Sequence, residues 1–116
     1  MDTIEVVTIP VEGNLILETV ANTLEAVREK LDGGYVAQIF VSGEPAVLLV
    51  DEDGTGKGLP VNPPATRLAR SYGLLGGGGG LVGPVVLVGL SRGWWADVPA
   101  LSVGRLGALG YRLEGL

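Results

Sequence analysis

The sequence contains no cysteine and no histidine. Without cysteine, disulfides, thiolate zinc sites and cysteine nucleophiles are excluded. Without histidine, the commonest general base and the commonest metal ligand are missing, and most hydrolase triads are excluded with them. We therefore predict that the protein is not an enzyme, needs no cofactor and holds no metal ion. Catalysis by carboxylates alone, such as Asp51 or Asp53, is the alternative within the enzyme class.

Basic residues and long apolar segments are also scarce. The chain has 8 Lys and Arg against 13 Asp and Glu, a net charge of −5, which disfavours general nucleic-acid binding because phosphates need a basic surface. The apolar run at residues 81–90 is too short to cross a bilayer. Residues 1–5 lack the basic and apolar regions of a signal peptide. We expect a soluble, cytoplasmic protein without membrane contact.

Aliphatic residues and glycine dominate what is present. Apolar residues make up 47% of the 116 residues and aromatic ones only 5%, so we expect a core of Val, Leu and Ile. The length is that of one domain, and we expect residues 1–116 to form it. Five consecutive glycines at 76–80 predict a flexible loop, because regular structure does not survive that backbone entropy.

The order of the expected elements predicts the fold class. Composition and periodicity place strands at residues 3–9, 15–20, 35–41, 46–50 and 85–90, with a short one at 111–113. Helices are expected at residues 23–32, 63–72 and up to 109, capped by Asn22, Asn62 and Ser102 in turn. Residues 91–97 are expected to form a loop. Short turns favour antiparallel neighbours. We predict an α+β fold, with a mixed or mainly antiparallel sheet of four to five strands and two to three helices packed on it.

Five short motifs follow one another along this chain, at residues 23–26, 33–35, 51–54, 58–62 and 83–89. In this order they resemble a family of small phage and actinobacterial proteins that carry domain of unknown function 3846. The likeness covers residues 4–90. Where the family is often basic after the asparagine, this chain has Pro63 and Pro64. The resemblance implies phage or mobile-element ancestry, and it implies no activity and no catalytic residues.

The glycine-rich acidic turn at residues 51–58 invites two readings besides a plain turn. Asp51, Asp53 and Thr55 have the spacing of the first calcium-loop ligands, but Asn62 stands where a bidentate Glu is required. Glycine-rich backbone with Lys57 can also hold an anion, although the spacing of a nucleotide-binding P-loop is absent. We interpret the segment as a polar turn without metal, and whether it has a function stays open.

Four further side chains are candidates for binding a nucleotide-like small molecule. Arg67 and Arg70 share a helix face and can hold a phosphate or a carboxylate, though such a face is also common as a solvated surface. Lys57 adds a cation, and Trp94 offers a ring for stacking a base. We therefore take Lys57, Arg67, Arg70 and Trp94 as candidate ligand-binding residues.

Trp94 and Trp95 are adjacent in the expected loop. Neighbouring side chains in a loop point in different directions, so at least one ring is expected to be partly exposed. An exposed tryptophan suits an interface anchor or a stacking platform, whereas the alternative is a ring at the edge of the core. We take both as candidate interface residues.

Two hypotheses about function follow. The first is a non-catalytic binding module of phage or mobile-element type, which acts through protein–protein interaction with a host protein or through self-association. A homo-oligomer is expected because a mean hydropathy of +0.41 leaves apolar surface to cover, most simply in a symmetric dimer. The second is a protein that binds or sequesters a nucleotide-like small molecule and so counters host defence signalling.

Overall fold

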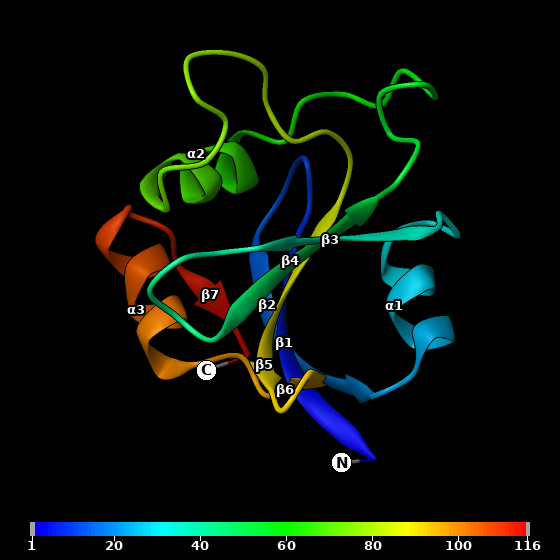
Figure 1. Ribbon diagram of the computed structural model, residues 1–116, viewed down its shortest axis with the longest axis vertical. Helices are drawn as coiled ribbons and strands as arrows, with labels where there is room; N and C mark the ends of the chain where they lie inside the picture. The colour runs from blue at the N-terminus through cyan, green and yellow to red at the C-terminus, as the bar shows by residue number, and fades with distance from the viewer. Residues whose placement is uncertain (1, 116) are drawn as a thin grey trace.

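One sheet with helices on both faces makes up the described part of the computed structural model, which covers residues 2–115 (Figure 1). The strands are β1 (Thr3–Ile9), β2 (Leu15–Ala21), β3 (Val36–Phe40), β4 (Ala46–Asp51), β5 (Val85–Ser91), β6 (Trp94–Ala96) and β7 (Leu113–Glu114). The helices are α1 (Leu24–Lys30), α2 (Pro63–Ser71) and α3 (Ala100–Ala108). Within this range no helix is long and apolar enough to cross a membrane.

The sheet is mainly antiparallel. Its strand order is β3-β4-β5-β1-β2-β7, and β6 pairs with β5 beside this path. Each pairing is antiparallel except that of β2 with β7. The predicted α+β class is therefore confirmed. The predicted number of strands was too low, because the described residues form seven.

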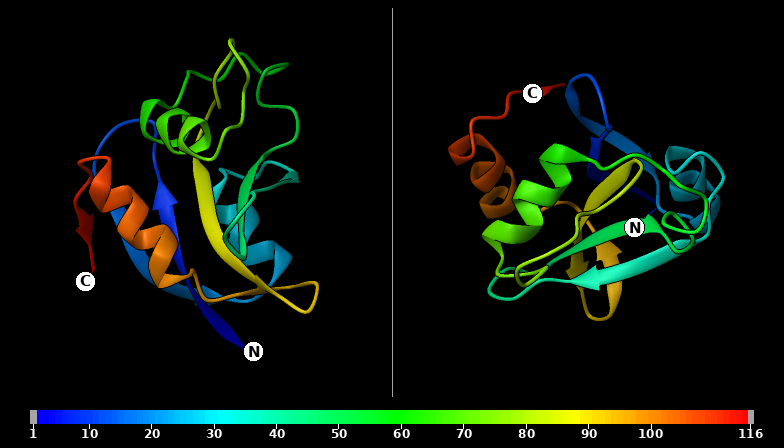
Figure 2. Two further views of the ribbon diagram at one scale, coloured as in Figure 1. Left: turned by 60° about the vertical axis from the view of Figure 1, so that its left-hand side comes forward. Right: turned by 90° about the horizontal axis from the view of Figure 1, so that it is seen from above.

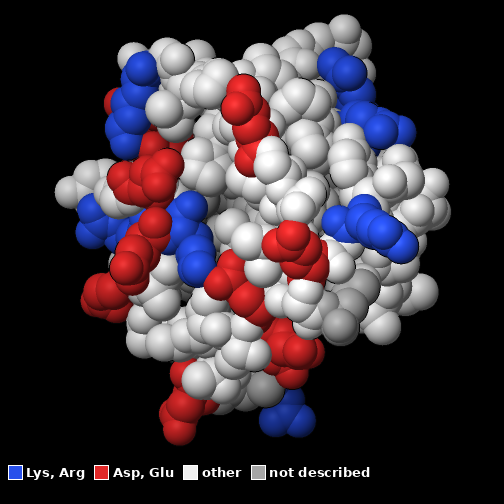
Figure 3. All heavy atoms as spheres, turned by 180° about the vertical axis from the view of Figure 1, so that it is seen from behind, with Lys and Arg blue, Asp and Glu red and all other residues white. Residues whose placement is uncertain are grey.

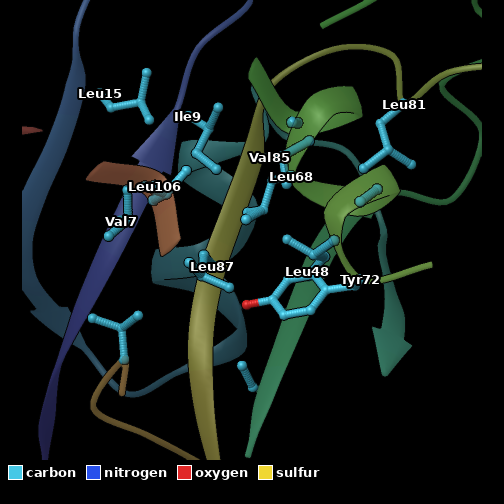
Figure 4. Packing of buried hydrophobic residues seen from close by; sticks show 14 residues of the cluster. Val7, Ile9, Leu15, Leu48, Leu68, Tyr72, Leu81, Val85, Leu87 and Leu106 are labelled. Atoms are coloured by element: carbon cyan, nitrogen blue, oxygen red, sulfur yellow. The ribbon is translucent and has the colours of Figure 1, made fainter. Parts of the chain in front are cut away.

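The central strand β5 separates two apolar layers. On one face, Val85 and Leu87 belong to a cluster that α2 and α3 cover, as Figure 4 shows. On the other face, Val86 and Val88 belong to a second cluster that includes Val27 of α1. Figure 2 shows α2 and α3 on one side of the sheet and α1 on the other. This two-sided burial explains why β5 is apolar at successive positions, unlike a strand with one wet face.

Two of the three predicted helix caps were wrong. Thr23, not Asn22, caps α1, and its hydroxyl accepts a hydrogen bond from the N–H of Ala26 at 3.1 Å. Asn22 prolongs the sheet instead, because its N–H donates to the carbonyl of Asp2 at 2.9 Å. Helix α3 begins directly after Pro99, its N-cap residue, rather than at Ser102. The Ser102 hydroxyl lies inside the helix and donates to Glu44 instead. The predicted cap Asn62 is confirmed at α2.

The prediction of a loop over residues 91–97 was also wrong. Trp94 to Ala96 form β6, which returns along β5 with Trp95 opposite Leu90. The turn residues Arg92 and Gly93 have φ of +53° and +81°. Positive φ at both central residues is the geometry of a tight two-residue hairpin turn, whose twist matches that of the strands. The five glycines at 76–80 do lie in a loop, between α2 and β5.

Asn62 joins three segments at the end of the sheet. Its side chain is fully buried, and its amide nitrogen donates to the carbonyls of Ile9 and Gly83 at 2.9 Å each. Its amide oxygen accepts from the N–H of Ala65 at 3.0 Å and so caps α2. The hydrogen-bonding groups of the side chain therefore all have partners, and these partners come from β1, the start of α2 and the segment before β5.

We expect Asn62→Asp to lower the free energy of unfolding by about 3 kcal/mol. Aspartate keeps the helix cap but loses both donors, so that two carbonyls lose a hydrogen bond each, and it brings a negative charge into a fully buried position. Urea unfolding followed by circular dichroism measures the change. Asn14→Asp makes the same replacement at an exposed turn. It removes the hydrogen bond from the Asn14 amide to Glu114, but because that contact is exposed to solvent it is expected to cost less than about 1 kcal/mol. Equal unfolding midpoints for the two variants would contradict this account of Asn62.

Candidate functional site

The β5–β6 hairpin holds Trp95 firmly against the α1 side of the sheet. Trp95 packs against the second apolar cluster, and its indole N–H donates to the side-chain oxygen of Gln38 at 2.9 Å. Its carbonyl accepts from the side chain of Asn22 at 3.2 Å. The short hairpin turn and these contacts from β3 and the start of α1 fix the position of β6.

Trp94, the neighbouring residue, has 77% of its surface exposed. It borders two open hollows of about 310 Å³ and 630 Å³. We call the first the Trp94 hollow; its lining residues are Asn22, Leu24, Gln38, Gly93, Trp94 and Trp95. Leu24, at its rim, is also exposed. An exposed tryptophan on an anchored hairpin, beside a hollow with apolar and amide groups, has the composition of a binding hot spot.

Lys57 is engaged within its own turn. Its ammonium group lies 2.6 Å from a carboxylate oxygen of Asp51, whose side chain is 2% exposed. The other carboxylate oxygen accepts from the N–H of Asp53 at 2.9 Å. The hydrogen bond from Lys57 lowers the pKa of Asp51 most, and the Asp53 bond adds to this against the effect of burial. The charge of Lys57 is thus already matched by a buried carboxylate.

Arg67 and Arg70 both lie exposed on α2, but they contact different groups. The guanidinium of Arg67 donates to the hydroxyl of Tyr111 at 3.2 Å and lies 5.2 Å from the centre of that ring. Arg70 donates to the carbonyl of Gly79 at 3.0 Å. The structure therefore does not direct the two guanidinium groups toward one shared acceptor.

The four candidate ligand-binding residues do not form one site. Figure 1 places α2 and the turn at residues 51–58 toward the upper end of the sheet, whereas β6 lies at the lower end. Trp94 is accordingly separated from Lys57, Arg67 and Arg70, and none of these three lines the Trp94 hollow. The predicted pair of interface residues is brought together, because Trp94 and Trp95 line the same hollow.

Sequence reasoning missed a partly buried polar cluster around Glu44. One carboxylate oxygen accepts from the hydroxyls of Tyr72 at 2.6 Å and Ser102 at 2.8 Å. The other accepts from two nitrogens of Arg105 at 3.0 and 2.7 Å, and that guanidinium lies 4.3 Å from the centre of the Tyr72 ring. The cluster joins the β3–β4 turn to α2 and α3. No local sequence pattern predicts this cluster, because Glu44 and Arg105 are 61 residues apart.

The charges of this cluster are fixed near neutral pH. Burial raises the pKa of Glu44, but the hydrogen bonds from Arg105, Tyr72 and Ser102 outweigh it and bring that pKa below its usual value. Burial and the bond to Glu44 raise the pKa of Tyr72 to about 12. With four donors on one carboxylate, no lone pair is left for a substrate. We interpret the cluster as a structural clamp.

Glu18 is the third carboxylate with a shifted pKa, and its charge is also paired within the fold. Burial raises the pKa of Glu18, but bonds from Lys30 and Thr8 outweigh it, so that the net shift is downward. In the described range, no group of three or more Asp, Glu, His or Cys side chains is placed to hold a metal ion. Figure 3 shows acidic side chains down the middle and along the left of the face seen from behind, with separate basic groups at the left, at the right and at the lower end. That face offers no continuous basic surface to a nucleic-acid backbone.

No protein-family model, no curated protein and no solved structure matches this chain. The resemblance to the phage and actinobacterial family therefore stays a prediction from the motifs. Function has to be argued from the geometry of the Trp94 hollow and of the closed polar clusters.

We expect the clamp to make the unfolding free energy depend on pH through Glu44. Because the folded-state pKa of Glu44 is lowered, its contribution is fully present above the unfolded pKa and is lost as pH falls through the folded pKa. Glu44→Gln is expected to lower the free energy of unfolding by about 1–2 kcal/mol at pH 7, because Arg105, which is partly exposed, loses its charged partner.

Denaturant unfolding at a series of pH values checks this expectation. The difference between the natural chain and Glu44→Gln is expected to shrink below about pH 4, where the natural carboxylate becomes protonated as well. Glu12→Gln, at an exposed turn position, serves as the control with little change at any pH. A Glu44→Gln effect that stays constant from pH 7 to the acid end would contradict the assignment.

Proposed function

We propose that the chain is a non-catalytic binding module that acts through a protein–protein contact centred on the Trp94 hollow. The observation that carries this proposal is the 77% exposure of Trp94 on a hairpin whose next residue is anchored by Gln38 and Asn22. A large apolar ring held rigidly in solvent loses little conformational entropy when a partner covers it. The fold itself does not need this ring, since it packs in neither apolar cluster.

The partners of the carboxylates with shifted pKa values also support a non-catalytic role. Acids and bases that act in catalysis usually have perturbed pKa values and face a cleft. The carboxylates with shifted pKa values here are Glu18, Glu44 and Asp51, and each is closed by a cation and further donors. None of them lines the Trp94 hollow.

A protein partner is better supported than a nucleotide-like ligand. A nucleotide needs cations within reach of the stacking ring, and Lys57, Arg67 and Arg70 each have another contact elsewhere. Arg92 does border Trp94, but it lines the second hollow and not the Trp94 hollow. The polar side chains of the hollow, Asn22 and Gln38, are neutral amides. The resemblance to phage and actinobacterial proteins favours a phage or mobile-element origin, and in that case the partner is a host protein.

Affinity capture with matched variants tests the proposal. The immobilised chain, Trp94→Ala and Leu101→Ala are incubated with lysate of the source cells, and retained proteins are quantified by mass spectrometry. Leu101 is the control because it is 69% exposed on α3, outside the hollow. We expect a protein retained by the natural chain and by Leu101→Ala, and depleted about tenfold or more with Trp94→Ala. Identical retention by all three would contradict the proposal.

Native mass spectrometry with a small-molecule extract of the same cells distinguishes this proposal from the alternative, the binding of a nucleotide-like ligand. The proposal expects no adduct of nucleotide size on the natural chain. An adduct that disappears with Lys57→Ala or Arg67→Ala would favour the ligand-sequestering function instead, and the Trp94 hollow would then lose its assigned role.

A further inference from the structure

Strand β3 is an open edge of the sheet. It is the first strand in the order, and β4 is its one neighbour. Figure 2 shows β3 along the outside of the sheet, in the view from above. An edge strand carries a row of backbone donors and acceptors that another strand can pair with.

The pairing with β4 shows which backbone groups of β3 face outward. Tyr35 lies directly before β3, and its carbonyl accepts from the N–H of Glu52 at 2.7 Å. In an antiparallel ladder this direction alternates along the strand, so Ala37 and Ile39 also face β4. The N–H and C=O groups of Val36, Gln38 and Phe40 therefore point away from the sheet. Within residues 2–115, no other segment hydrogen-bonds to these outward groups.

Strand β3 carries none of the usual protection against pairing. Natural edge strands are commonly blocked by a charged residue, a proline or a bulge. The sequence of β3 is VAQIF, with no charge and no proline, and its pairing with β4 runs without a break from Val36 to Phe40. Phe40 is 57% exposed.

We propose that β3 pairs antiparallel with β3 of a second copy of this chain, around a two-fold axis at Gln38. In this register Gln38 lies opposite Gln38 of the second copy, and Val36 lies opposite Phe40. These are the residues whose backbone groups face outward, so the register forms hydrogen-bonded pairs with about six main-chain bonds. The interface is isologous, as a closed dimer requires.

A second copy of the chain is the partner that best fits β3, because it meets the exposed Phe40 end of one strand with the α1-covered Val36 end of the other. At the Val36 end the face is covered by α1, because Val36 packs against a cluster that contains Val27 and Leu31. At the Phe40 end the ring lies exposed. Antiparallel pairing places each Phe40 beside Val36 and α1 of the other copy. An unrelated extended peptide would cover Phe40 with one opposite side chain only and would bring no such helix.

The area available indicates a weak dimer. Tyr35 is 67% and Phe40 57% exposed, which corresponds to about 250 Å² of side-chain surface per copy if each ring spans about 200 Å². A standard interface buries about 800 Å² per partner. Strand pairing and the flanks of α1 add to the rings, so we expect a dissociation constant in the micromolar range.

The pairing would change how the Trp94 hollow is used. Two sheets joined edge to edge around this axis present the same face to the same side, so the dimer carries two Trp94 hollows side by side on one surface. A partner with two matching sites would then bind with avidity. The pairing itself does not rest on partner binding at the hollow.

Sedimentation velocity over a concentration series tests the pairing. We expect the natural chain to pass from monomer to dimer between about 10 µM and about 500 µM. Phe40→Lys places a charge opposite Val36 and is expected to weaken dimerisation by about tenfold or more, whereas Leu101→Lys, at a similarly exposed apolar position, leaves it unchanged. Trp94→Ala is also expected to dimerise, which separates this proposal from partner binding. A natural chain that stays monomeric, or Phe40→Lys that dimerises normally, overturns the pairing.

A cross-link tests the register even if Phe40→Lys folds poorly. The chain contains no cysteine, so Gln38→Cys introduces a single thiol on the expected two-fold axis. A short bifunctional maleimide is expected to join two copies of Gln38→Cys at a protein concentration where Leu101→Cys stays monomeric. Equal yields of cross-linked dimer from the two variants overturn the register and the choice of edge.

Discussion

The apolar character of β5 on both faces is the constraint on which the rest of the structure depends. Its residues from Val85 to Val88 are fully buried, so the sheet needs a covering layer on each side. One side has two helices of nine residues, α2 and α3. The other has only α1, with seven. Trp95 packs on the same side of the sheet as α1. Together with Leu24 and Gln38 it lines the Trp94 hollow.

The two sides of the sheet consequently differ in what they can do. On the α2–α3 side, Asn62 and the Glu44 clamp satisfy buried polar groups that local backbone bonds cannot reach, and this side is closed. The α1 side carries the exposed Phe40 on the edge strand β3, and next to it the Trp94 hollow, which Leu24 of α1 and Gln38 of β3 line. We propose that this side is the surface that the chain offers to another protein.

The sequence predicted those parts of the fold whose signals are local. Strands β1 to β5 and helix α2 follow from alternation, turn residues and the cap at Asn62, which all act within a few residues. Strand β6 was missed because Arg92 gives no sign of the positive φ that its tight turn requires. The Glu44 clamp was missed because its members meet only after the sheet has brought α3 against α2. Trp94 and Trp95 were found as a pair from composition, while their separation from Lys57 depended on the topology.

A concentration series of ¹H–¹⁵N correlation spectra tests most directly whether strand β3, at the open edge of the sheet, is where copies of this protein contact each other. Between dilute and concentrated samples, the account expects shifts at the amides of Val36, Gln38 and Phe40, with the exposed α2–α3 surface around Leu101 unchanged. Shifts around Leu101 without shifts in β3 would contradict the account, and so would spectra that do not change with concentration.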